Sequence, residues 1–240
     1  MRAQILGCLS VLLLAMPPAL AAAPDMDGYA NTGPSLDGIG KSYMGRQIAY
    51  VMGHEAADWL DRPEREREEG TARVVPLLGL KPADVVADIG AGSGYFSFRM
   101  SAAVPQGKVY AVDIQKEMLD LIKARQAKAG GANITTVLGG VADPRLPAGA
   151  VDLILLVDAY HEFSYPREMG LAMVRALKPG GRIALVEYRG EDPKVPIRDT
   201  HRMTQVQAKK EMAVLGLAWQ RTDDSLPWQH VMFFAKPSAP

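Results

Sequence analysis

A short apolar run that leads directly into closely spaced glycines sets the first limit on the fold of this chain. Residues 85–89 are apolar except for Asp88, and Gly90, Gly92 and Gly94 follow at once. Glycine has no side chain, so the backbone can bend sharply there and a ligand can approach it closely. Free amides at the start of a following helix attract negative groups. The pattern predicts a buried strand, a tight turn and a helix that together hold a ligand.

Beyond Gly79 the chain alternates short β-branched runs with helical periods. The runs are almost continuously apolar, as is typical of parallel strands that are covered by helices on both faces. The sequence therefore predicts an α/β fold with a doubly wound sheet. The expected strands span residues 84–89, 108–113, 134–138, 151–157, 182–187, 219–222 and 231–235, with a helix near His201 to Leu215.

An acidic residue, Asp113, ends the second of these runs, nineteen residues after Gly94. A carboxylate at this place can accept hydrogen bonds from both hydroxyls of a ribose. Dinucleotide enzymes share this arrangement, but their fingerprint is G-x-G-x-x-G. Here the glycines run G-x-G-x-G, and Tyr95 stands where the third glycine of that fingerprint belongs. The spacing therefore favours an adenosyl cofactor without a pyrophosphate.

The stretch from Asp88 to Gly94 resembles the first motif of the class I S-adenosylmethionine-dependent methyltransferases. Residues 112–114, 151–158 and 177–182 resemble later motifs of that family, and the likeness covers roughly residues 72–240. The resemblance implies S-adenosylmethionine as the cofactor. It also implies a seven-stranded, mostly parallel sheet whose last strand is antiparallel.

The resemblance also assigns expected roles within the cofactor site. Gly90, Gly92 and Gly94, with Ala91 between them, are expected against the methionine part, and Asp113 with Ile114 against the ribose, while Asp88 supports the loop. Members of the family often place an acidic residue near the adenine, and Asp143 is the nearest match. Asp143 could equally be a turn residue before Pro144, because Asp is common in turns.

The segment from Asp158 to Phe163 leaves the fourth expected strand at the carboxyl edge, where ligands of such sheets bind. Methyl transfer depends mainly on positioning, and a hydroxyl acceptor is helped by a base. We expect His161 to be this base, with Asp158 and Tyr160 as positioning groups. A capping or core role for His161 explains the sequence as well.

The histidines give no pattern that is typical of a metal site. His161-Glu162 begins like a zinc-protease motif, but position 165 is Tyr and supplies no second histidine. His54, His201 and His230 lie far apart without ligand spacing. No metal is therefore expected.

The first 23 residues have the pattern of an export signal: Arg2, an apolar stretch from Ile5 to Leu14, and small residues before a cleavage point at or near Ala21. The protein is then expected in the periplasm, without a stable membrane span in its mature form, since the apolar run is short. An uncleaved tether is the alternative. The single cysteine, Cys8, lies within this segment.

Residues 24–40 are rich in Gly, Pro, Asp and Asn and are expected to be a flexible leader. From Lys41 apolar residues recur at spacings of three and four, which predicts a helical cap over residues 41–80. The cofactor-binding domain is expected over residues 81–240. The apolar positions of the first cap helix are Met44, Ile48, Val51, Met52, Ala56, Trp59 and Leu60.

The sequence thus predicts methyl transfer from S-adenosylmethionine to a small-molecule acceptor. Lys plus Arg and Asp plus Glu both number 27, so the composition offers no basic excess for nucleic acid. Export conflicts with a cofactor that is made in the cytoplasm. Two alternatives therefore stay open: an exported, non-catalytic binding or scaffold protein on this fold, and an NAD-dependent oxidoreductase.

Overall fold

The computed structural model describes residue 25, residues 27–33 and residues 35–238. The expected export signal, residues 1–23, lies outside this part of the chain, and export stays a prediction. Among the described residues, no helix is long and apolar enough to cross a membrane.

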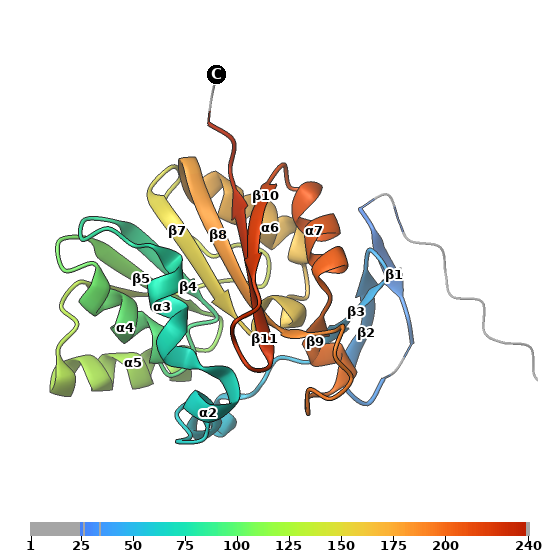
Figure 1. Cartoon of the computed structure of the whole chain (residues 1–240), viewed down its shortest axis with the longest axis horizontal. Helices are drawn as coiled ribbons and strands as arrows, with labels where there is room; N and C mark the ends of the chain where they lie inside the picture. The colour runs from blue at the N-terminus through green and yellow to red at the C-terminus, as the bar shows by residue number, and fades with distance from the viewer. Residues whose placement is uncertain (1–24, 26, 34, 239–240) are drawn as a thin grey trace, which may run out of the picture.

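A large, mostly parallel sheet forms the centre of the molecule (Figure 1). Its strand order is β10-β11-β8-β7-β4-β5-β6, and the short β9 pairs with β8 at one side of this path. β4 to β8 run parallel to one another, whereas β11 runs antiparallel to β8. The predicted doubly wound α/β fold with an antiparallel last strand is therefore confirmed. The strands are β4 (Val85–Ile89), β5 (Lys108–Asp113), β6 (Ile134–Leu138), β7 (Val151–Val157), β8 (Leu177–Arg189), β9 (Arg202–Met203), β10 (Ala218–Asp223) and β11 (Gln229–Ala235).

Helices cover both faces of this sheet, which explains why its strands are apolar throughout. On one face, Phe96 and Met100 pack with Val86 and Leu153 in one buried cluster. On the other face, the side chains of α6 and α7 pack with Ile154 and other strand residues in a second cluster. The first face carries α3 (Val74–Leu78), α4 (Tyr95–Ala103) and α5 (Lys116–Ala129), and the second carries α6 (Pro166–Ala176) and α7 (Gln205–Ala213).

The helix expected near His201 to Leu215 begins later than predicted. His201 ends the short 3-10 helix η4 (Asp199–His201), and β9 follows before α7 starts at Gln205. Thr204 caps α7, because its hydroxyl accepts a hydrogen bond from the Gln207 amide at 3.1 Å. This cap fixes the start of the helix and leaves His201 outside it.

The N-terminal segment differs most from its prediction, because it contains a small antiparallel sheet. Its strands are β1 (Tyr29–Asn31), β2 (Gly38–Tyr43) and β3 (Arg46–Ala49). The flexible leader expected over residues 24–40 therefore includes β1 and the start of β2. The helix expected from Met44 is wrong over its first turns. Met44 and Gly45 both have positive φ, at 49° and 94°, and form the two-residue turn of a hairpin. Ile48, expected on a helix face, is buried with Tyr29 and Tyr43.

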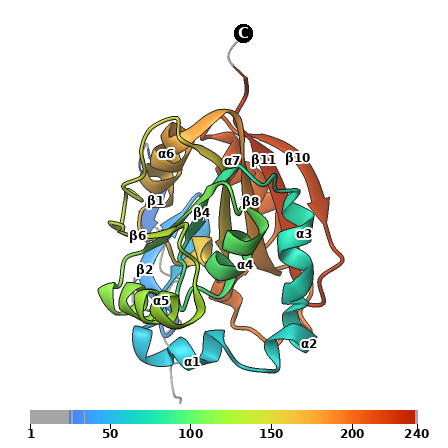
Figure 2. The same cartoon turned by 90° about the vertical axis from the view of Figure 1, so that its left-hand side faces the viewer.

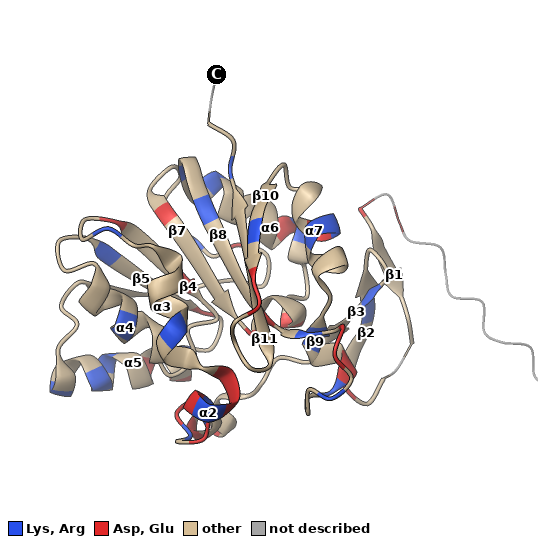
Figure 3. Cartoon of the chain, viewed as in Figure 1, with Lys and Arg blue, Asp and Glu red and all other residues tan. Residues whose placement is uncertain are grey.

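Only the later part of the expected helical cap is helical, and its helices are short. It contains η1 (His54–Ala56), α1 (Ala57–Leu60), α2 (Arg65–Glu69) and η2 (Thr71–Arg73) before α3. Figure 2 shows α1 and α2 at opposite sides of the lower edge of the molecule, and Figure 3 shows both basic and acidic residues on α2. Pro63 falls between α1 and α2, where its ring prevents one continuous helix.

Long-range polar contacts hold the small sheet against the main domain. The guanidinium of Arg46 donates to both carboxylate oxygens of Glu211 on α7, at 2.8 and 3.0 Å, and both side chains are buried. The Tyr29 hydroxyl donates to Glu168 on α6 at 2.5 Å. Lys41 donates to the carbonyl oxygen of Ser164 at 2.9 Å. Arg46 also donates to the His161 carbonyl at 3.1 Å, so β3 lies next to the loop that follows β7.

Candidate active site

A cavity of about 450 Å³ lies at the carboxyl ends of the central strands. Residues from many separate parts of the sequence line it. They come from the N-terminal segment, the ends of β4 and β5, the loops after β6 and β7 and the loop before β9, with single residues from α5, α6 and β8. Ligands of open α/β sheets bind at this edge. The cavity is therefore the candidate active site.

The glycine turn after β4 forms part of the cavity wall through Gly90 and Gly92. Gly90 has a φ of 77°, and a Cβ there would lie 2.6 Å from the Cβ of Ala159. Gly92 has a φ of 53°, and a Cβ there would meet the side chain of Leu60. A larger residue at either position would therefore strain the backbone and fill the space beside the cavity.

Asp113, at the end of β5, lies in the wall next to this turn. Its carboxylate accepts hydrogen bonds from the amides of Gly92 and Gln115, both at 2.9 Å. Burial raises the pKa of Asp113 above its ordinary value, although these amides oppose the change. The contacts fix the carboxylate at the cavity while its remaining lone pairs can accept ribose hydroxyls.

Three other residues of the predicted cofactor motif support the turn and do not line the cavity. Asp88 is buried beneath it and accepts a hydrogen bond from the Ser97 hydroxyl at 2.6 Å, consistent with the expected supporting role. Gly94, with a φ of 81°, begins α4. Ala91 donates its amide hydrogen to the carbonyl of Val112 at 3.0 Å, so it ties the turn to β5. Burial raises the pKa of Asp88 to about 6.

The two remaining predicted cofactor residues lie in different places. Ile114 lines the cavity beside Asp113. Asp143 does not line it, because its carboxylate accepts from the Arg145 amide at 2.7 Å and pairs with Arg175 at 2.9 Å near the surface. Of the two readings that the sequence left open for Asp143, the geometry agrees with the turn residue.

The N-terminal segment closes one side of the cavity, so Trp59 and Arg62 lie in its wall. The side chain of Gln115 joins this segment to β5, since it donates to the Met52 carbonyl at 2.9 Å and accepts from the His54 amide at 2.8 Å. The Arg62 guanidinium stacks over the Trp59 ring at 3.7 Å from the ring centre. The sequence suggested a covering role for this region, and the structure places short helices rather than one long helix there.

Asp158 lies in the wall directly after β7 in a left-handed conformation, with a φ of 50°. Its Oδ2 accepts a hydrogen bond from Gln229 at 2.6 Å, whereas its buried Oδ1 has no hydrogen-bond partner among the described residues. Burial raises the pKa of Asp158 well above its ordinary value, and Glu69 and Glu187 raise it further. Such a group is suited to bind a cationic ligand.

His161 is buried, and both of its ring nitrogens are engaged. Nδ1 lies 2.6 Å from Glu187 Oε2, and Nε2 lies 3.0 Å from Nδ1 of His201. Burial opposes protonation, but the attraction of Glu187 outweighs it, and the pKa of His161 is raised. His161 lines the cavity, but neither of its ring nitrogens is free to act as a base, and its catalytic role stays a prediction.

Tyr160 does not line the cavity, although it was expected to be a positioning group. Its ring is fully buried between Phe163 and the Arg46 guanidinium, which lies 5.4 Å from the ring centre. Its position indicates a packing role beneath the loop. The neighbouring positions 158 and 161 face the cavity instead.

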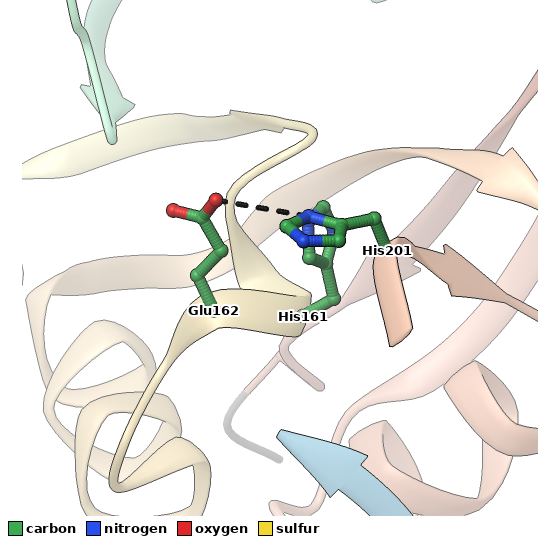
Figure 4. Close-up of side chains that lie close together, drawn as sticks. All are labelled: His161, Glu162 and His201. Carbon is green, nitrogen blue, oxygen red and sulfur yellow. Dashed lines mark hydrogen bonds and ion pairs between the residues drawn. The ribbon is translucent and has the colours of Figure 1, made fainter. Parts of the chain in front are cut away.

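Glu162 and His201 are cavity residues that the sequence did not single out as functional (Figure 4). Their carboxylate Oε1 and imidazole Nδ1 lie 3.9 Å apart. Burial raises the pKa of Glu162 to about 7, while burial and the nearby His161 lower the pKa of His201 to about 4. The two residues are 39 positions apart in the chain, so no local spacing signals their proximity.

The residues around the glycine turn fit the adenosyl sulfonium cofactor that the sequence implied. Gly90 and Gly92 give access to the backbone, Asp113 offers a fixed carboxylate, and the unpartnered Oδ1 of Asp158 provides an acidic group that can ionise against a cation at the same wall. A buried carboxylate without a partner is costly, and a cationic ligand relieves that cost.

Residues 86–181 match a family model described as "Methyltransferase domain". The chain is 27% identical to malonyl-[acyl-carrier protein] O-methyltransferase from Methylococcus capsulatus, over 88% of this chain and 65% of that protein. It is 31% identical to nocamycin O-methyltransferase from Saccharothrix syringae, over 47% of this chain and 41% of that protein. The match therefore spans less than two thirds of either relative.

A solved structure shares the fold over most of the described chain. It is a SAM-dependent methyltransferase from Aquifex aeolicus, with a TM-score of 0.73 and 23% identity, and it aligns over 78% of this chain and 100% of that one. Together with the strand order and the glycine turn, the match over residues 86–181 supports a class I S-adenosylmethionine-dependent methyltransferase domain, and this fold implies S-adenosylmethionine as the cofactor.

Proposed function

We propose that this protein transfers a methyl group from S-adenosylmethionine to an oxygen atom of a small-molecule acceptor. The observation that carries the proposal is the pair of carboxylates, Asp113 and Asp158, in one cavity wall beside the glycine turn. Backbone amides fix the carboxylate of Asp113 in a position to bind the ribose hydroxyls. The carboxyl group of Asp158 is buried, and its Oδ1 has no hydrogen-bond partner among the described residues. Two of the curated relatives are named as O-methyltransferases, which supports an oxygen acceptor, although other curated relatives are named as C-methyltransferases.

The bound cofactor supplies a methyl group that its sulfonium already activates. The protein then has to align the acceptor and exclude water. Met52 and Phe163 provide apolar wall, while Glu162 and His201 provide polar groups against which an acceptor hydroxyl can lie. With cofactor and acceptor bound, Glu162 and His201 would receive the proton that the acceptor hydroxyl gives up on methylation.

Calorimetry of the purified chain with S-adenosylmethionine, S-adenosylhomocysteine and NAD tests the cofactor part of the proposal. We expect binding of the first two and no binding of NAD. The Asp113→Ala variant should bind S-adenosylhomocysteine about 100-fold more weakly, because it loses charged hydrogen bonds worth roughly 1.5–3 kcal/mol each. Asp143→Ala is the matched control, since it removes an acidic residue that lies outside the cavity.

Unchanged binding in Asp113→Ala would contradict the assigned site. Transfer itself is tested by incubating the protein with methyl-labelled cofactor and a set of phenols, hydroxy acids and carboxylic acids, with label in an extracted product as the readout. Cofactor binding without transfer to any extract of the source cell would favour the alternative of a non-catalytic binding protein.

A further inference from the structure

We infer that His161, Glu162 and His201 form a binding site for a divalent transition metal of the zinc class. Each residue offers one ligand atom, and the three atoms all lie within 4.8 Å of one another (Figure 4). The set of two imidazoles and one carboxylate is a ligand combination that Zn²⁺ uses in catalytic sites. The inference is independent of cofactor binding, because none of the three residues belongs to the glycine turn or contacts Asp113.

The distances between the ligand atoms suit a metal centre. Bonds of 2.0–2.1 Å in a tetrahedral arrangement place ligand atoms about 3.3 Å apart. Nε2 of His161 and Nδ1 of His201 are 3.0 Å apart, and Oε1 of Glu162 lies 3.9 Å from the same Nδ1. One distance is slightly shorter and the other slightly longer than the tetrahedral value, so a small movement of the Glu162 side chain brings all three ligand atoms within bonding distance of one metal ion.

The surroundings of His161 orient it as metal-binding histidines are oriented. Its Nδ1 lies against the buried carboxylate of Glu187 at 2.6 Å, which directs Nε2 toward the other two ligands. A carboxylate behind a histidine ligand is the usual supporting arrangement at zinc. Arg46 adds a second support, because its guanidinium donates to the His161 carbonyl at 3.1 Å.

The cluster is open on one side, because all three residues line the cavity. Glu162 and His201 are partly exposed, at 16% and 26% of their side-chain area, whereas His161 is buried. Three protein ligands with an open position are typical of a catalytic rather than a structural zinc site. If the proposed function holds, that position would take the acceptor oxygen and favour its deprotonation.

The experiment measures metal uptake by the full chain without any methyl acceptor. Purified protein is treated with a chelator, dialysed, and titrated with Zn²⁺ against a chromogenic indicator, with bound zinc counted by elemental analysis. We expect one Zn²⁺ per chain. His201→Ala should weaken uptake at least about 100-fold, and Glu187→Gln by about 10–100-fold, the range for supporting carboxylates. His54→Ala, a partly exposed histidine outside the cluster, is the control and should leave uptake unchanged.

Absence of stoichiometric uptake, or equal uptake in wild type and His201→Ala, would overturn the inference and leave Glu187, His161 and His201 as a hydrogen-bonded chain. Circular dichroism and S-adenosylhomocysteine calorimetry on each variant show that it is folded. Glu162→Gln is used if His201→Ala fails to fold, and it should also weaken uptake. Zinc uptake without cofactor binding would contradict the proposed function but not this inference. Cofactor binding without zinc uptake would contradict this inference but not the proposed function.

Discussion

The two sides of the cavity differ in how far apart their residues lie in the sequence. The cofactor side comes from residues 88–115, a continuous path of strand, turn, helix and strand. The acceptor side is assembled from residues 51–62, 158–164 and 196–201. The first is set by local backbone rules, and the second depends on contacts between distant segments.

The contrast teaches where each side can fail. Positive φ at Gly90 and Gly92 and the amide contacts of Asp113 shape the cofactor side within one strand–turn unit. The acceptor side instead needs the small N-terminal sheet in place, and the buried pair of Arg46 and Glu211 secures it. Damage to that pair should therefore affect the acceptor side first.

The largest effect is expected from Arg46→Met. If this variant weakens cofactor binding as much as it disturbs the acceptor side, the distinction between the two sides is wrong. The variant leaves Glu211 as a buried charge without its partner and removes the donor to the His161 carbonyl. The free energy of unfolding should fall by about 3–5 kcal/mol. S-adenosylhomocysteine affinity should stay near the wild-type value at a temperature where the variant is folded. Chemical denaturation and calorimetry measure the two quantities.

The double variant Arg46→Met/Glu211→Met is the control for that experiment. Replacing a buried ion pair by apolar residues is often close to neutral, so most of the lost stability should return. An equal loss of cofactor affinity in the single and double variants would mean that the two sides are not separable.

A second, smaller effect is expected on the pH dependence of stability when Asp88, which supports the glycine turn, is changed to Asn. Burial raises the folded pKa of Asp88 to about 6 from 3.8, with a further contribution from Asp113, although Ser97 and Arg65 oppose it. The folded state then binds the proton more tightly, so this residue makes stability fall as pH rises from about 4 to about 6. Asn can still accept from Ser97 but does not ionise. The variant should therefore gain up to about 3 kcal/mol relative to wild type between pH 4 and pH 7.

Urea denaturation at a series of pH values measures this gain. Ser97→Ala serves as a control that removes the hydrogen bond but keeps the carboxyl group. A constant difference between Asp88→Asn and wild type across the pH series would show that the carboxyl is not perturbed in the folded protein.

The sequence predicts the cofactor side well, because its signals are local. The apolar run, the glycine spacing and Asp113 are all close in the chain, and each is a backbone requirement of one turn. Most strands of the central sheet begin and end within a few residues of their predicted bounds. The exceptions are β8, which starts earlier at Leu177, and the short β9, which lies where a helix was predicted. Continuous apolar runs of this length are typical of parallel strands that are buried on both faces, so few other structures fit them.

The acceptor side and the N-terminal sheet could not be predicted in the same way. Met44 and Gly45 form a hairpin turn, but Met is not a residue that usually marks such a turn, and the spacing of Met44, Ile48 and Val51 matched a helix. Arg46 is buried only because Glu211 lies against it, 165 positions later in the chain. His201 reaches His161 in the same non-local way, so the expectation of no metal site rested on sequence spacing alone.

The smallest expected effect is on cofactor affinity in a variant of Asp158, a residue that lies where the cofactor side and the acceptor side meet. The pKa of Asp158 is raised in the free protein, and a cationic ligand binds the ionised carboxylate, so cofactor binding below that pKa must release a proton. Affinity for S-adenosylmethionine should therefore rise with pH. Asp158→Asn, which tolerates the left-handed backbone, should bind about tenfold more weakly and release no proton. Calorimetry in two buffers with different ionisation enthalpies counts the proton, and equal proton release in wild type and variant would exclude Asp158 as the partner of the cation.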